Sequence, residues 1–222
     1  QLGEVDEIDG LITAAVEAHP QNWRLLKQAA LSYLTTEHYG YVVAGKFNRG
    51  HRRGGGEFVS SIDRDRVLAL QLLEKALPLV GDETAKPEVG EFYNQFAETV
   101  FFGLEAWELQ VLTDWKQVPD FEPGYYWGRR GRGGGGSTVR GASVDAEGNP
   151  VYHTVPKQFA DAQSDGQRWR WLLNAAAEAK PGLKNQLDLT WAQFLHTQFG
   201  VQTMAGFQPS DDDASNDVDE AA

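Results

Sequence analysis

The chain carries two similar glycine- and arginine-rich segments: GYVVAGKFNRGHRRGGGEF at residues 40–58 and GYYWGRRGRGGGGSTVRG at residues 124–141. Each begins with Gly-Tyr, continues through arginines and includes a run of glycines. Each follows amphipathic helical sequence and precedes, sooner or later, a helix that ends in Ala-Leu-Pro or Ala-Lys-Pro. This arrangement predicts one helical unit that is used twice, with an insertion at the same place in both copies.

The composition of the chain indicates a folded protein. Its 222 residues fit one large or two small domains, and 41% of them are hydrophobic. The absence of cysteine excludes disulfides, thiolate catalysis and cysteine-ligated zinc. No apolar run approaches the length of a membrane span. Because the sequence starts at Gln1 rather than Met, we expect a processed or engineered fragment, and a removed signal peptide is one explanation.

Charge is unevenly distributed along the chain. The net charge is −12, and the tail from Ser210 to Ala222 alone contains six acidic residues. Each glycine-arginine segment contains four basic residues and stands out against this acidic background. A protein that grips nucleic acid is usually basic over its whole domain, so the overall charge favours a different partner.

Apolar residues at helical spacing predict about seven helices. Asn22 and Ser60 are suitable N-caps, and proline or glycine marks most of the helix ends. The expected helices cover approximately residues 4–18, 22–38, 60–81, 87–103, 104–115, 164–179 and 184–199.

The remaining sequence predicts a small amount of β-structure. A short hairpin is expected over residues 41–59, and residues 151–155 form a second β-prone run. The stretch of residues 118–162 lacks a helical pattern, which is unusual within a compact domain. We leave three explanations open for it: a functional loop, local disorder or a β-hairpin.

The ends of several expected helices resemble the joints of tetratricopeptide repeats. Residues 14–23, AAVEAHPQNW, show a helix end with alanine and proline, followed by an asparagine cap. We therefore predict an all-α fold: tetratricopeptide-like antiparallel helix hairpins over residues 1–207, with Gly/Arg-rich insertions at residues 40–58 and 124–156 that form one or two small β-hairpins. Residues 208–222 are predicted to be an acidic disordered tail or linker.

The two segments allow four interpretations. Their arginines and aromatic rings could dock an acidic protein surface, grip RNA by stacking and phosphate contacts, or cradle a phosphate in a glycine loop. The fourth interpretation is structural: the glycines meet special backbone angles and the arginines pair with acidic residues of the helices. No Gly-Lys-Ser or Gly-Lys-Thr follows either glycine run, which disfavours a nucleotide loop.

We assign the candidate partner-binding residues to these segments. They are Tyr41, Phe47, Arg49, His51, Arg52, Arg53, Tyr125, Tyr126, Trp127, Arg129, Arg130 and Arg132. No catalytic, cofactor-binding or metal-ligating set is predicted, because the five histidines are scattered and the acidic tail lacks the ligand spacing of a calcium loop. Most serines and histidines are expected to have structural or surface roles.

Residues 37–76 (EHYGYVVAGKFNRGHRRGGGEFVSSIDRDRVLALQLLEKA) resemble the helical N-terminal region of large secreted bacterial alpha-2-macroglobulin-like proteins. The resemblance is strongest over residues 20–80. It implies an accessory module at the front of a larger chain and an extracytoplasmic location. The thioester of that family cannot be carried over, because this chain has no cysteine.

The sequence as a whole predicts a non-enzymatic protein–protein interaction module without a cofactor. Its partner would be a protein or peptide segment, or an adjacent domain of the same chain. Nucleic-acid binding through the two arginine-, glycine- and aromatic-rich segments is the alternative.

Overall fold

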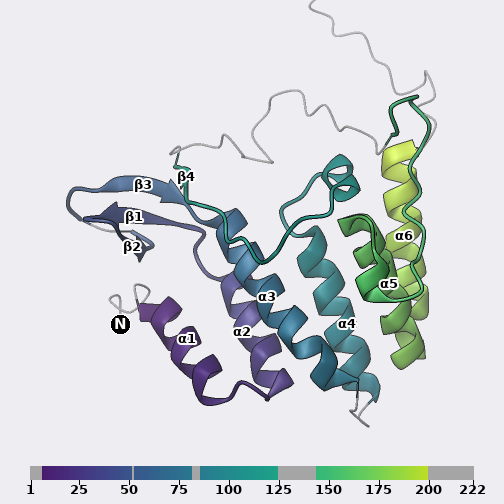
Figure 1. The fold of residues 1–222 in the computed structure, drawn as a ribbon, viewed down its shortest axis with the longest axis horizontal. Coiled ribbons are helices and arrows are strands. Elements are labelled where there is room, and N and C mark those ends of the chain that lie inside the picture. The colour runs from purple at the N-terminus through teal and green to yellow at the C-terminus, as the bar shows by residue number, and fades with distance from the viewer. Residues whose placement is uncertain (1–6, 52, 82–85, 125–143, 200–222) are drawn as a thin grey trace, which may run out of the picture.

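A computed structural model of the chain describes residues 7–51, 53–81, 86–124 and 144–199. Within these residues the chain forms six α-helices, a small antiparallel sheet and several short 3-10 helices. Figure 1 shows the helices side by side, with the sheet projecting from one end of the helical layer.

The first two helices, α1 (Ile8–Ala18) and α2 (Trp23–Thr35), form a pair joined by a short turn. Pro20 follows the end of α1, as expected from the restriction that proline places on the preceding residue. The side chain of Asn22 accepts a hydrogen bond from the backbone N–H of Leu25, so the predicted N-cap of α2 is confirmed.

The sheet contains four strands: β1 (Tyr39–Val43), β2 (Lys46–Arg49), β3 (Glu57–Ser60) and β4 (Glu122–Pro123). Their order is β2-β1-β3-β4, and all neighbours are antiparallel. Ala44 and Gly45 join β1 to β2 with φ angles of 50° and 78°. Two successive positive φ angles are typical of the tight turn that matches the twist of a hairpin.

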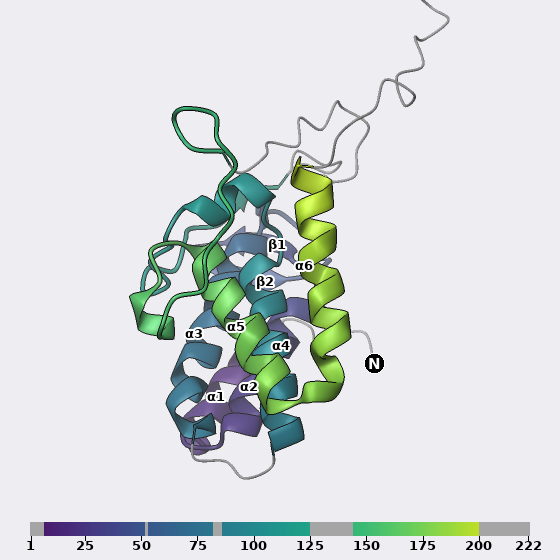
Figure 2. The same cartoon turned by 90° about the vertical axis from the view of Figure 1, so that its right-hand side faces the viewer.

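Four helices follow the first three strands: α3 (Ile62–Val80), α4 (Lys86–Phe101), α5 (Asp165–Ala179) and α6 (Lys184–Phe199). The 3-10 helices are η2 (Ala106–Gln110), η3 (Phe159–Asp161) and η4 (Pro181–Leu183). Figure 2 shows α5 and α6 side by side at one end of the layer.

The closest helix packing is between α2 and α3 and between α4 and α5. Each of these pairs encloses one of the two insertions in the sequence. The core between the helices is aromatic: Trp23 meets Phe92 edge to face at 5.8 Å, and Phe96 lies 5.8 Å from Trp115. The described part of the second insertion is limited to residues 124 and 144–156, so the predicted insertion boundaries stay a prediction.

The prediction of an all-α, tetratricopeptide-like fold with about seven helices is wrong. The four-stranded sheet makes the fold a mixed α+β one, with six helices in the described residues. Residues 104–115, predicted to be one helix, form only η2 and then an extended chain. The reason lies in α5: the carboxylate of Asp165 accepts hydrogen bonds from the backbone N–H and the hydroxyl of Thr113 and holds this chain extended.

A substitution at Gly90 tests the contact between α4 and α5. A Cβ atom at this position would lie 2.4 Å from Cβ of Lys180 and 3.1 Å from the carbonyl oxygen of Ala176. We expect Gly90→Ala to lower the free energy of unfolding by about 1–3 kcal/mol, although alanine favours a helix by about 1 kcal/mol. Urea unfolding followed by tryptophan fluorescence measures the change.

Gly10 provides the matched control. It also lies within a helix, but no atom lies within 4 Å of the position that a Cβ would occupy. Gly10→Ala should raise the free energy of unfolding by about 0.5–1 kcal/mol. Equal effects of the two substitutions would mean that the close contact at Gly90 does not constrain the helices.

Candidate functional site

The two glycine-arginine segments meet in one sheet. β3 begins at the end of the first segment and continues beyond it, and it pairs with β4, which ends directly before the second segment. The backbone N–H of Gly124, the first residue of the second segment, donates a hydrogen bond to the carbonyl of Phe58 in β3. Glu57 lies at the free end of the sheet, which we call the sheet tip (residues 43–46 and 56–57). Figure 1 shows this end pointing away from the helices.

The first glycine of each segment is explained by an aromatic ring packed against it. A Cβ on Gly40 would lie 2.6 Å from the ring of Phe47 and 2.3 Å from the carbonyl oxygen of Asn48. A Cβ on Gly124 would lie 2.2 Å from the ring of Phe58. The glycine that starts both segments therefore reflects close packing within the sheet.

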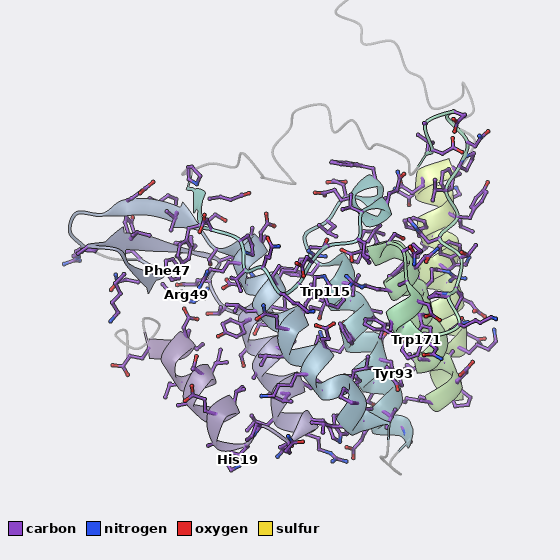
Figure 3. The ribbon with its side chains drawn as sticks, viewed as in Figure 1. His19, Phe47, Arg49, Tyr93, Trp115 and Trp171 are labelled. Atoms are coloured by element: carbon purple, nitrogen blue, oxygen red, sulfur yellow. The ribbon has the colours of Figure 1, made fainter. Side chains whose placement is uncertain are left out.

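Arg49 lies in a buried ionic cluster and is only 3% exposed. Its two terminal nitrogens donate to the two carboxylate oxygens of Asp65, at 2.7 and 2.8 Å. The guanidinium also donates to Asp9 at 2.8 Å and to the carbonyl oxygen of Glu37 at 2.7 Å. Figure 3 shows Arg49 between the sheet and the helices. This cluster, which we call the sheet anchor (Asp9, His38, Arg49, Ser61 and Asp65), fixes the sheet to α1 and α3.

The electrostatics of the sheet anchor agree with a stable ion pair. Burial alone would raise the pKa of Asp65, but hydrogen bonds from Arg49 and His38 outweigh burial and lower it. Burial alone would lower the pKa of Arg49, and its bonds to Asp65 and Asp9 raise it instead. We therefore assign Arg49 a structural role and leave it out of the proposed contact surface.

The rings of Tyr41 and Phe47 also make internal contacts. Tyr41 is 9% exposed and lies 5.3 Å from Phe58 on one face of the sheet. Phe47 stacks on Phe121 at 4.5 Å, and the guanidinium of Arg64 lies 4.9 Å from the ring of Phe121. Both rings therefore stabilise the sheet.

His51 and Arg53 are exposed, as is Lys46, which the sequence analysis did not select. We call these three residues the basic sheet surface. The other predicted binding residues lie outside the described part of the chain: Arg52, Tyr125, Tyr126, Trp127, Arg129, Arg130 and Arg132.

A second buried ionic cluster was missed by the sequence analysis. Asp165 is fully buried at the start of α5, and Arg168 donates to its carboxylate at 2.8 Å. Arg66 lies 3.6 Å from the same carboxylate and donates to the carbonyl oxygen of Val100 at 2.7 Å. Burial lowers the pKa of Arg66, although Asp165 favours its charged form. We call this group, with Thr113, the α5 anchor.

The only signal for the α5 anchor in the sequence was Ser164, a serine directly before the start of a helix. Ser61 precedes α3 and Ser164 precedes α5, and each helix carries a buried aspartate in its first turns. The pattern marks helix starts, but it does not reveal which distant arginine reaches the carboxylate.

Two further observations concern the described residues. No group of three or more His, Asp or Glu side chains in them could hold a metal ion. None of their helices is both long and apolar enough to cross a membrane.

Comparisons with protein-family models, curated proteins and solved structures found no match to this chain. The resemblance to alpha-2-macroglobulin-like proteins, and the extracytoplasmic location that it implies, therefore stay predictions.

Proposed function

We propose that the chain is a non-enzymatic protein-interaction module whose contact region is the sheet and the two glycine-arginine segments that it carries. The observation that supports this most strongly is the pairing of β3 with β4. It joins the roots of both segments in one sheet, although the segments are far apart in the sequence. The partner is a protein or peptide segment, or an adjacent domain of a longer chain.

The partner's chemistry follows from the side chains at this end of the molecule. Lys46, His51 and Arg53 are exposed, whereas the charge of Arg49 is taken up by Asp9 and Asp65. The sequence of the second segment contains four further arginines. A protein surface that bears carboxylates complements this charge, and such complementarity mainly sets association rate and specificity.

The test is a charge reversal on the basic sheet surface. The double variant Lys46→Glu/Arg53→Glu should reduce capture of a protein partner at least tenfold. The measurement is a pull-down with the full chain from extracts and secreted fractions of the source organism, with and without nuclease. The control is Lys75→Glu/Lys157→Glu, which makes the same charge change at two exposed lysines outside the sheet; its capture should stay unchanged.

Two results would overturn the proposal. One is equal capture by the parent chain and by Lys46→Glu/Arg53→Glu. The other is recovery of nucleic acid that nuclease removes and that is lost steeply as salt rises, because phosphate contacts release counterions. The second result would establish the nucleic-acid alternative.

A further inference from the structure

An irregular segment crosses the start of α5 and the end of α6. We call residues 150–158 the strap; it begins at Pro150, which forms an isolated bridge with Val144, and it leads into η3. Figure 2 shows this segment running beside α5. Most of the strap is exposed: Tyr152 keeps 54% and Val155 39% of its surface. His153 is its only buried residue.

His153 fills a closely fitted site between α5 and α6. It is 3% exposed, and its ring lies 5.9 Å from the ring of Phe194 in α6. On the other side is Gly166 in the first turn of α5, where a Cβ would lie 2.2 Å from Nδ1 of His153. The absence of a side chain at Gly166 therefore makes room for the imidazole.

The site offers no stabilisation to a charged imidazole. Neither ring nitrogen of His153 has a hydrogen-bond partner within the described residues. The charged group that acts on the imidazole is the guanidinium of Arg170 in α5. This guanidinium lies 3.7 Å from the ring centre of Trp191 in α6, and the carboxylate of Asp188 favours its charged form. From α6 the contact is the apolar ring of Phe194. Burial, and then Arg170, lower the pKa of His153 to about 4.

The rest of the strap is held weakly. Thr154 accepts a hydrogen bond of 3.3 Å from the side chain of Gln167, and Tyr152 packs on Phe199 at 5.1 Å. Since surface contacts of this kind contribute little, the burial of His153 is the main contact that keeps the strap in place.

We propose that the strap is an acid-released latch: uptake of a proton by His153 expels its ring from between α5 and α6 and frees residues 150–158, while the helices stay folded. The direction of the pH effect follows from the linkage between protonation of His153 and release of the strap. A free histidine titrates at its ordinary value of about 6.5, so the released strap gains the proton first as the pH falls.

The absence of cysteine allows a specific probe of this latch. A nitroxide label on Val155→Cys of the full chain, attached at pH 7.5, reports strap mobility by electron paramagnetic resonance. With a pKa of about 4 in place and about 6.5 when released, the ratio of mobile to immobile label should rise about 30-fold between pH 7.5 and 5.0. The same label on Asn174→Cys, at an exposed position of α5, should not change.

Two non-titrating variants complete the test. In His153→Phe and His153→Gln, the label at Val155→Cys should show the same mobile fraction at both pH values; the glutamine variant covers the case in which phenylalanine does not fit. The inference is overturned if the mobility of wild type does not depend on pH, if it changes equally in the variants, or if the label in α5 becomes mobile as well.

Discussion

Arg49→Met should lower the free energy of unfolding by about 3–5 kcal/mol, because it leaves the carboxylate of Asp65 buried without its main partner. Asp65 is fully buried, and Arg49 binds both of its oxygens. The variant also removes the bond from the sheet to Asp9 in α1. Urea unfolding followed by tryptophan fluorescence measures the loss at pH 7.

The control for Arg49→Met is Arg53→Met, an exposed arginine of the same segment. Its effect should stay within about 0.5 kcal/mol, as for most surface substitutions. The double variant Arg49→Met/Asp65→Leu should lose less stability than the two single effects together, because neither charge of the pair is then left alone. If Arg49→Met behaves like Arg53→Met, the sheet anchor does not stabilise the fold.

The sheet anchor also has an expected pH signature. The pKa of Asp65 is lower in the folded chain than its ordinary value of 3.8. A lowered carboxyl pKa contributes stability above the ordinary value, and this contribution disappears as the pH falls through the folded value. The loss of stability in acid should therefore be shallower in Arg49→Met than in wild type.

Asp165→Ala should have an effect of similar size, about 3–5 kcal/mol, through the loss of the α5 anchor. The substitution leaves Arg66 and Arg168 without the carboxylate that they share. It also frees Thr113, whose hydroxyl and backbone N–H both donate to Asp165. Thermal unfolding followed by circular dichroism provides the measurement.

The control for Asp165→Ala is Asp161→Ala, an exposed aspartate four residues earlier in η3. We expect it to change the free energy of unfolding by less than about 0.5 kcal/mol. Thr113→Val should cost an intermediate amount, about 1–2 kcal/mol, because it removes one hydrogen bond and leaves the ion pairs intact. An effect of Asp165→Ala no larger than that of Thr113→Val would contradict the role given to the α5 anchor.

Local sequence patterns predicted most of the helices, because their apolar stripes and caps are encoded over a few neighbouring residues. For example, Pro20 and Asn22 mark the turn between α1 and α2, and the helical spacing around Leu70 marks α3. The hairpin of β1 and β2 could also be anticipated, since its turn and its flanking residues are adjacent in the sequence.

The remaining parts depend on contacts between distant residues. β4 contains two residues, one of them a proline, and it is recognisable as a strand only through its pairing with β3 about 60 positions earlier. The amphipathic pattern of residues 104–115 indicated a helix, but Asp165 and the burial of Trp115 determine an extended path. For the same reason Arg49 was assigned to the surface: the acids that surround it come from α1 and α3.

Asp65 and Arg66 are neighbours in α3, yet they belong to different anchors. Successive residues on a helix point about 100° apart, so one turn of α3 can reach the sheet with one side chain and α5 with the next. A single rotation of this turn would break both sets of ion pairs together. The sheet and the C-terminal helices are therefore expected to lose their structure in one cooperative transition, with α3 as the element that couples them.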